Sequence, residues 1–227
     1  MEMHTNLETF ECLNPGLPRW IEAPLALMAL IVLAPVMAIV ALAISLTSGS
    51  PVLFHQERVG KGTKLFTLIK FRTMKPDKVG LQVTASDDER VTPIGRILRR
   101  TKLDELPEFW NVVKGDMSLV GPRPEVPRYV DLHDERWRAI LGARPGLTDT
   151  ITLRLRNEES LMANVKDGRE QFYVRNLQAW KLDGYLQYLN SRTWWTDVRV
   201  LASTAQALVR GGSAPPTIDE LRLFNSH

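Results

Sequence analysis

The sequence of 227 residues has one cysteine, Cys12, so no disulfide bond can form within the chain. This count excludes the disulfide-rich folds of small secreted domains and suits a reducing compartment. The sequence also lacks Cys and His arrays with zinc spacing and shows no internal repeat. Charge is lacking over one long stretch, because no Asp, Glu, Lys or Arg occurs in residues 23–54. Aliphatic and aromatic residues are otherwise too frequent for a disordered protein.

The charge-free stretch begins with a nearly continuous apolar segment, residues 23–46. A straight helix of this length would measure about 36 Å, enough to cross the hydrocarbon layer of a bilayer. Pro35 lies in its middle, where it removes a backbone donor and clashes with the preceding turn, so we expect the helix to kink or break there. Two arrangements stay open at this point: a helix that spans the membrane, and a broken helix that enters one leaflet and returns.

The two flanks of this segment differ in charge. Arg19 is the only basic residue before it, whereas seven Lys and Arg residues occur between residues 58 and 78. Short basic flanks stay on the cytoplasmic side, so we expect the large domain to face the cytoplasm. The overall charge of +3 is modest and no nucleic-acid-binding module is recognisable, so nucleic acid is not an expected partner.

The remainder predicts an α/β fold that is predominantly helical. Alternating apolar residues indicate a small β-hairpin, with strands over residues 51–58 and 64–73, in which Lys70 and Arg72 share one face. Thr92 followed by Pro93 is typical of a helix start. A second helix is predicted over residues 103–113, with its carboxylates on a polar face.

Two later segments also have a recognisable pattern. Residues 151–156, ITLRLR, predict a short extended run. Residues 194–208 predict a helix with an apolar stripe formed by Trp194, Val198, Leu201, Ala205 and Leu208. Packing of this stripe in the core is favoured over an amphipathic helix lying on the bilayer, which stays the alternative.

Adjacent carboxylates at Asp104 and Glu105 follow directly after a basic run that includes Arg99 and Lys102. Because nearby cations favour the ionised form, we expect Asp104 to keep a low pKa and to act as a nucleophile or a metal ligand. Mg²⁺ prefers carboxylate oxygen and commonly bridges it to phosphate, so Mg²⁺ at Asp104 is the expected cofactor. The plainer alternative is a solvated first turn of a helix, where acidic residues favour the helix dipole.

Basic residues on loops and strand faces exceed what packing usually needs, and phosphate is their natural ligand because the Arg fork binds it through two hydrogen bonds. Prolines on both sides of Arg123 hold that arginine in extended backbone. The candidate phosphate-binding residues are Lys70, Arg72, Arg99, Arg123, Arg144, Arg154 and Arg156.

Four motifs together resemble the bacterial monotopic phosphoglycosyl transferases, also called bacterial sugar transferases. They are QERVG at residues 56–60, KFRTM at 70–74, the segment 92–125 with LDEL followed by KGDMSLVGPRP, and ARPGLT at 143–148. The resemblance extends over residues 19–210 and corresponds to the minimal catalytic form of that family. It favours the re-entrant arrangement of the membrane helix, although the Ser-Pro pair that often makes the break is Ala34-Pro35 here.

The resemblance implies that a sugar 1-phosphate passes from a UDP-sugar to a polyprenol phosphate, such as undecaprenyl phosphate, with release of UMP. This reaction is the first membrane step of a surface glycan or glycoconjugate pathway. By the same resemblance Asp104 is the nucleophile that forms a covalent phosphosugar intermediate, and Glu105 assists it as a base or by orienting groups. Basic family positions are matched by Lys70, Arg99, Arg123 and Arg156, with Arg154 as a rival to Arg156.

The expected organisation is an N-terminal flank at residues 1–22, a re-entrant helix-turn-helix at 23–50, a catalytic domain at 51–210 and a tail at 211–227. Residues 74–90 are expected to form a mobile loop. The resemblance implies a monotopic protein of the bacterial inner membrane, in contact with phospholipid, with its catalytic domain on the cytoplasmic face. After Thr148 the chain departs from the common family string, which leaves the choice of UDP-sugar open.

A rival hypothesis from another class is a non-catalytic, membrane-anchored scaffold whose basic face recruits anionic lipid or a glycosyltransferase. It predicts that substitution of Asp104 changes little beyond surface charge. A homodimer is a further partner hypothesis that the sequence leaves open.

Overall fold

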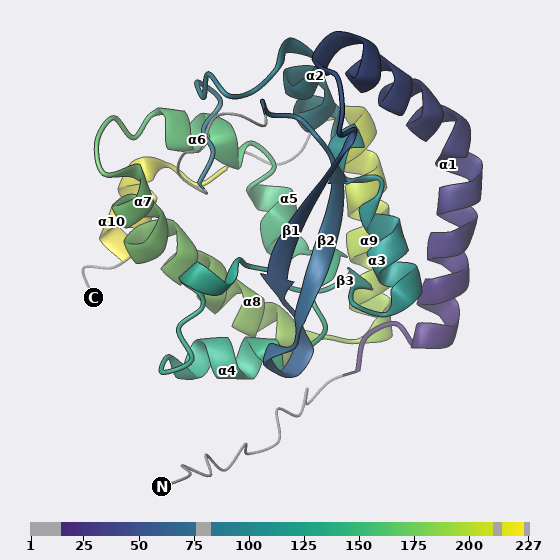
Figure 1. Ribbon diagram of the computed structural model, residues 1–227. Coiled ribbons are helices and arrows are strands. Elements are labelled where there is room, and N and C mark those ends of the chain that lie inside the picture. Colours follow the sequence, from purple (N-terminus) through teal and green to yellow (C-terminus); the bar gives the residue numbers. More distant parts are fainter. Residues whose placement is uncertain (1–14, 76–82, 211–214, 225–227) are drawn as a thin grey trace, which may run out of the picture.

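The computed structural model describes residues 15–75, 83–210 and 215–224. Helices make up most of the fold and pack with two small sheets, which confirms the predicted α/β, predominantly helical class (Figure 1). The elements in chain order are α1 (Arg19–Ser48), β1 (Leu53–Val59), η1 (Lys61–Thr63), β2 (Leu65–Phe71), α2 (Pro93–Thr101), η2 (Leu103–Glu105), α3 (Glu108–Lys114), β3 (Ser118–Val120), η3 (Pro127–Tyr129), α4 (Glu135–Leu141), β4 (Gly146–Thr148), α5 (Thr150–Arg154), α6 (Glu158–Ala163), α7 (Arg169–Phe172), the π-helix η4 (Tyr173–Gln178), α8 (Ala179–Ser191), α9 (Trp194–Arg210) and α10 (Ile218–Phe224).

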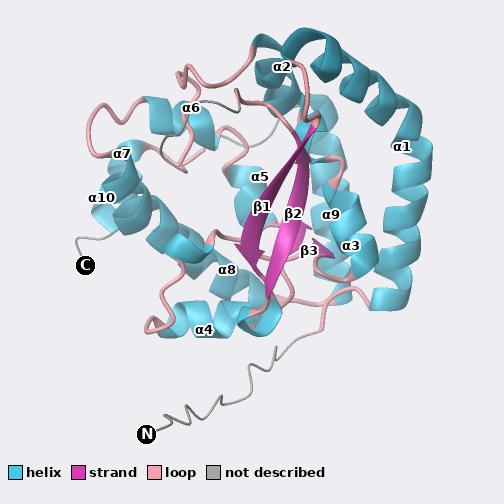
Figure 2. Cartoon of the chain, viewed as in Figure 1, coloured by secondary structure: helices cyan, strands magenta, loops and turns pink. Residues whose placement is uncertain are grey.

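The predicted hairpin is confirmed as the antiparallel pair β1 and β2, visible as the two long arrows in Figure 2. Its register runs from Leu53 opposite Phe71 to Val59 opposite Leu65. Phe66 and Leu68 on one face of β2 are buried in the main core, as the period of two requires. The second sheet is smaller and joins β3 and β4 in parallel.

Helix α1 does not end at Pro35, so of the predicted kink or break the structure has no break, and the helix-turn-helix expected at residues 23–50 is one continuous helix. Helical backbone continues through Pro24 and Pro35 from Arg19 to Ser48, and the axis bends instead in the second half of the helix (Figure 1). The physical reason is that one proline removes one intrahelical hydrogen bond and displaces one carbonyl, which bends the helix while the neighbouring bonds hold.

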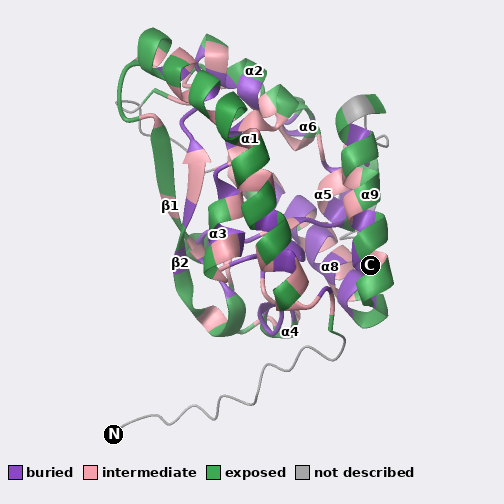
Figure 3. Cartoon of the chain, turned by 90° about the vertical axis from the view of Figure 1, so that its right-hand side faces the viewer, coloured by how far each residue is buried: buried purple, intermediate pink, exposed green. Residues whose placement is uncertain are grey.

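Both ends of α1 are fastened to the folded domain. Near its start, Glu22 is fully buried and accepts a hydrogen bond from the backbone N–H of Leu119 at 2.9 Å. At its end, the Arg72 guanidinium donates to the carbonyl oxygens of Ser48 and Gly49, each at 2.6 Å. Between these contacts much of the apolar helix surface is exposed, and it forms the long green face in Figure 3. That exposed set includes Leu27, Met28, Ile31, Val32, Ile39, Leu42 and Leu46.

Two helix boundaries follow local capping rules. Thr92 caps α2, as predicted, because its hydroxyl oxygen accepts a hydrogen bond from the N–H of Gly95 at 3.0 Å. The extended run predicted at residues 151–156 is wrong, since α5 occupies most of it. Asp149 starts that helix by accepting hydrogen bonds from the N–H groups of Ile151 and Thr152, and this cap outweighs the β-propensity of the residues that follow.

Helix α9 packs with a different face from the one predicted. Asp197, Val200 and Ala207 are buried, whereas Trp194, Val198 and Leu208 of the predicted core stripe are exposed. The exposed stripe includes Trp195, which stacks on Trp194. Of the predicted stripe, Leu201 packs against the main core, whereas Trp194, Val198 and Leu208 form an exposed apolar face of an amphipathic helix.

The outermost regions fall partly outside the described residues. Of the loop predicted at 74–90, residues 76–82 are not described, and the ends of the loop are joined by a bridge between Met74 and Val91. Of the tail predicted at 211–227, residues 215–224 are described and contain α10, whose Leu221 is buried in the main core. This part of the tail belongs to the folded domain.

Candidate active site

Strand β2 carries the first cation of the site. Lys70 is the last-but-one residue of β2, and its ammonium group lies 3.3 Å from Glu105 Oε1 and 3.0 Å from Glu108 Oε1. The next residue, Phe71, points to the other side and packs with Val40 and Ile44 of α1. Alternation along the strand thus directs Lys70 to the acidic residues and its neighbour to α1.

A sharp turn after α2 presents the nucleophile candidate. Lys102 adopts a left-handed conformation (φ 61°, ψ 18°), which ends α2 and starts the 3₁₀ turn η2 that contains Asp104 and Glu105. Pro107 has no N–H, so it cannot extend the hydrogen-bond ladder back to η2, and α3 begins separately at Glu108. The single helix predicted over residues 103–113 is therefore two helical pieces.

Asp104 is buried, and its Oδ1 atom has no hydrogen-bond partner. Burial, followed by the negative charge of Glu105, raises the pKa of Asp104, and Lys70, Lys102 and Arg99 only partly oppose this effect. The low pKa predicted from the neighbouring cations is therefore wrong in direction, because desolvation of the carboxylate outweighs them. A carboxylate with a raised pKa is more basic, and so more nucleophilic, once it is ionised.

Glu105 behaves in the opposite way. Burial alone would raise the pKa of Glu105, but Arg123, Lys70 and Lys102 outweigh burial and hold this pKa well below its ordinary value. Arg123 Nη2 lies 2.5 Å from Glu105 Oε1 and supplies the strongest of these contacts. The adjacent carboxylates thus have their pKa values pushed apart, which is typical of paired acidic groups with different tasks.

The loop at residues 121–125 holds Arg123 in place. Glu125 at its end accepts a hydrogen bond from the Tyr173 hydroxyl, and Arg58 donates to the carbonyl oxygen of Pro124 at 3.0 Å. The backbone N–H of Val59 donates to the Glu125 carbonyl at 2.9 Å. The hairpin and the π-helix therefore both anchor the loop, which limits the freedom of the arginine it carries.

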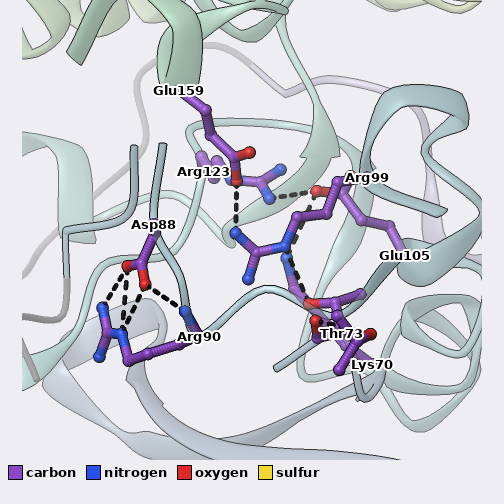
Figure 4. Close-up of polar contacts among 9 residues, drawn as sticks. Lys70, Thr73, Asp88, Arg90, Arg99, Glu105, Arg123 and Glu159 are labelled. Atoms are coloured by element: carbon purple, nitrogen blue, oxygen red, sulfur yellow. Dashed lines mark hydrogen bonds and ion pairs between the residues drawn. The ribbon is translucent and has the colours of Figure 1, made fainter. Parts of the chain in front are cut away.

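Arg99 reaches the same region from the last turn of α2. Its Nε donates to the hydroxyl of Thr73 at 2.8 Å, and its Nη1 lies 2.7 Å from Glu159 Oε1 on α6. Figure 4 shows the side chains of Arg99, Arg123 and Glu105 close together, with Glu159 approaching Arg99 from the other side. The structure brings together five of the predicted site residues: Lys70, Arg99, Asp104, Glu105 and Arg123.

Four candidate phosphate-binding residues lie elsewhere. Arg72 binds the end of α1, as described above, and is buried. Arg144 acts electrostatically on Glu22, near the start of the same helix. Arg156 donates to the carbonyl oxygen of Ala207 in α9, and its rival Arg154 lies over the ring of Trp180. Arg72, Arg154 and Arg156 have structural contacts, and Arg144 acts on the buried Glu22, so charge in the sequence did not separate these arginines from the site residues.

Two residues of the site were missed. Glu108 is the first residue of α3, with a side chain that is 1% exposed, and Lys102 acts on both carboxylates of the adjacent pair. Burial raises the pKa of Glu108, and Lys70 works in the opposite direction. The spacing of four residues between Asp104 and Glu108 was the available signal, because it favours one face of a helix.

The comparison with known families decides the assignment. The model of the bacterial sugar transferase family matches residues 14–211. The chain belongs to this family. The match includes α1, the hairpin, the acidic turn and the loop of Arg123, which are the elements that build the candidate site.

Three relatives illustrate the similarity. An Aeromonas hydrophila UDP-N-acetylgalactosamine-undecaprenyl-phosphate N-acetylgalactosaminephosphotransferase is 34% identical over 83% of this chain and 43% of its own length. A Caulobacter vibrioides UDP-glucose:undecaprenyl-phosphate glucose-1-phosphate transferase is 36% identical over 80% of this chain and 65% of its own length. An exopolysaccharide production protein of Rhizobium leguminosarum is 39% identical over 66% of this chain and 82% of its length. The chain thus spans less than two thirds of the first two relatives.

Proposed function

We propose that this bacterial sugar transferase is a phosphoglycosyl transferase that moves a sugar 1-phosphate from a UDP-sugar to a polyprenol phosphate, such as undecaprenyl phosphate, and releases UMP. The observation that carries the proposal is the buried Asp104 carboxylate, whose Oδ1 is free of hydrogen bonds among the cations Lys70, Arg99 and Lys102. The names of the Aeromonas and Caulobacter relatives, which are undecaprenyl-phosphate sugar transferases, support the same class of reaction.

The reaction proceeds in two displacements at one phosphorus atom. An oxygen of ionised Asp104 attacks the phosphorus that carries the sugar, the bond to the UMP oxygen breaks, and UMP leaves with the bonding electron pair. An oxygen of the polyprenol phosphate then attacks the same phosphorus and expels the Asp104 carboxylate, which gives a polyprenyl diphosphate sugar. Arg123, Lys70 and Arg99 stabilise the charge on the phosphate oxygens in both steps.

Glu105 stays ionised in both displacements because three cations lower its pKa. It therefore cannot donate a proton, and its contact with Arg123 at 2.5 Å fits a role in orienting that arginine and holding the phosphate-binding charge in place. Of the two roles that the family resemblance allows for Glu105, the geometry favours the orienting one.

Mg²⁺ fits the site through Asp104. Among the described residues no group of three His, Cys, Asp or Glu side chains is arranged to hold a metal ion. Mg²⁺ does not need such a cage, because it is commonly bound by one or two carboxylates together with substrate phosphates and water. The unpartnered Oδ1 of Asp104 offers the one protein ligand required, and the bound ion would neutralise charge on the diphosphate.

We also propose that the protein is monotopic in the bacterial inner membrane, with its catalytic domain on the cytoplasmic face. Among the described residues, α1 is the one helix long and apolar enough to cross a membrane. Its start and its end both bind the same domain, through Glu22 and Arg72. A spanning helix would place these ends on opposite sides of about 30 Å of hydrocarbon, so a bent helix that returns to one face fits the contacts better.

The activity is tested by incubating detergent-solubilised protein with polyprenol phosphate, Mg²⁺ and a panel of UDP-sugars while following UMP. At least one sugar should release UMP, and Asp104→Asn should abolish the release because the amide is not a nucleophile. Omitting polyprenol phosphate should leave a single burst of UMP, one per enzyme molecule, as the covalent intermediate accumulates. Failure of every sugar, or normal turnover by Asp104→Asn, would favour the non-catalytic scaffold instead.

The topology is tested with the native thiol, because Cys12 is the only cysteine and precedes α1. A membrane-impermeant thiol reagent should label Cys12 only after the inner membrane is opened. The matched control is the exposed domain residue His133, introduced as His133→Cys in a Cys12→Ser background, which should label in the same way. Labelling of Cys12 but not of the control in cells with an intact inner membrane would establish a spanning helix.

A further inference from the structure

Glu108 is a buried acidic residue to which the mechanism above assigns no task. Its side chain is 1% exposed and lies 3.0 Å from the Lys70 ammonium, measured from Oε1 to Nζ. Lys70 is shared, because the same ammonium lies 3.3 Å from Glu105 Oε1. Arg123 binds Glu105 from the other side at 2.5 Å. Charges of alternating sign therefore follow one another from Arg123 through Glu105 and Lys70 to Glu108.

This arrangement is poorly explained by stability. Burying a carboxylate costs several kcal/mol, and a buried ion pair offsets that cost only when its geometry is good and the remaining lone pairs are hydrogen-bonded. Glu108 Oε1 has no hydrogen-bond partner of acceptable geometry, although it touches Lys70. Asn111, one turn further along α3, shows what a structural polar residue does here: it bonds the β2 backbone at Thr67 and Ile69.

The position of Lys70 depends on Glu108. Without it, the ammonium would lose the closer of its two carboxylate contacts, and the flexible lysine side chain could close further onto Glu105. Glu105 also binds Arg123, so Lys70 would be drawn toward that pair and away from an incoming phosphate. With Glu108 present, the ammonium is held between the carboxylates of Glu105 and Glu108, close to Asp104.

We propose that Glu108 is a positioning residue that fixes the Lys70 ammonium where it meets a phosphate oxygen of the nucleoside diphosphate sugar. The proposal rests on the proposed function, since it assumes phosphoryl transfer at Asp104. The Glu108 carboxylate then has two opposite effects, one on substrate binding and one on the chemical step. As a negative charge Glu108 weakens binding of an anionic substrate, whereas as a positioning group it speeds the chemical step.

The test is Glu108→Gln, which keeps the shape of the side chain and removes its charge. The kcat for UMP release should fall by about 10- to 100-fold, the range expected for a misplaced charged group, while the KM for the UDP-sugar stays equal or decreases. Glu108→Asp, which keeps the charge but draws it back from Lys70, should lose part of kcat. Glu135→Gln is the matched control, because Glu135 is 91% exposed and far along the chain, and its kcat should equal that of the unaltered protein.

A double-mutant cycle with Lys70→Met isolates the route of the effect. In the Lys70→Met background, Glu108→Gln should cause no further loss of kcat, because the residue acts through that lysine. An unchanged kcat in both Glu108 variants, a full additional loss in the Lys70→Met background, or failure of both Glu108 variants to fold would overturn the positioning role. Absence of UMP release by the unaltered protein would instead refute the proposed function itself.

Discussion

Asp197 holds the segment that leads into α1, and its removal should destabilise the whole domain. The side chain is fully buried and lies 2.9 Å from Arg192 Nη2. It also accepts hydrogen bonds from the backbone N–H of Leu17 at 2.9 Å and from the Tyr188 hydroxyl at 2.5 Å. Asp197→Ala would remove the carboxylate that lies 2.9 Å from the buried Arg192 guanidinium.

The expected magnitude follows from this burial. Removing one partner of a buried ion pair typically costs about 3–5 kcal/mol, because the remaining charge stays desolvated. For a domain of this size each kcal/mol lowers Tm by roughly 2–4 °C, so Asp197→Ala should lower Tm by about 10 °C. Asp197→Asn keeps one acceptor oxygen, enough for either the Leu17 N–H or the Tyr188 hydroxyl but not for both, and should lose less than the alanine variant.

Two assays on detergent-solubilised protein measure the effect. Thermal unfolding followed by tryptophan fluorescence reports Tm, and limited trypsin digestion reports cleavage after Arg19, whose side chain donates to the Val113 carbonyl at 2.6 Å. The Asp197 variants should become sensitive to cleavage there. Asp183→Ala is the control, since its side chain is 38% exposed and its ion pair with Arg136 should contribute under about 1 kcal/mol. A fall in Tm no larger than the control's would refute the role of the buried pair.

Three further predictions concern the site. Lys102→Gly should raise Tm by about 2 °C, because glycine adopts the left-handed backbone at φ 61° without strain. The same change removes a cation and should raise the KM for the UDP-sugar. An unchanged Tm would show that the turn is unstrained. Only ionised Asp104 can attack, so kcat should fall as the pH falls through the Asp104 pKa, which is raised above its ordinary value of 3.8. The negative charge of Glu105 contributes to that rise, so Glu105→Gln should move the acid limb of the pH–rate profile to lower pH. Arg156→Ala should lower Tm through the lost contact with Ala207 and leave the KM for the UDP-sugar unchanged; a raised KM would return Arg156 to the phosphate site.

Local rules in the sequence predicted the elements whose cause is local. Alternation of apolar residues predicted the hairpin, and Thr92 followed by Pro93 predicted the start of α2. The structure confirms both elements. The error at residues 151–156 has the same origin, because a single cap at Asp149 reversed the preference of the residues after it. For α1 the pattern predicted length and apolarity correctly, but the consequence of Pro35 depends on how the neighbouring hydrogen bonds and the domain hold the helix.

The direction in which a side chain faces depends on residues far away in the sequence. The polar face predicted for residues 103–113 is inside the protein, because Glu108 meets Lys70 and Asn111 meets the open edge of β2. The sequence likewise does not show which arginines reach the site. Arg99 is half-buried and borders the acidic pair, whereas Arg72 is buried and binds the end of α1. The net positive charge after residue 55 indicated that this part of the chain binds phosphate, but it did not distinguish an arginine beside the acidic pair from one that binds α1.

The end of β2 connects α1 to the candidate active site. Three consecutive residues have separate tasks: Lys70 meets Glu105 and Glu108, Phe71 packs against α1, and Arg72 binds the carbonyl groups that end α1. A strand that is hydrogen-bonded along its length is stiff, so these contacts hold η2, the turn that contains Asp104, in place relative to α1. The phosphate of a polyprenol lies at the membrane surface, because its chain is held in the hydrocarbon layer. On the proposed function, Asp104 is held at a fixed distance from α1 and meets that phosphate without any large movement of the domain.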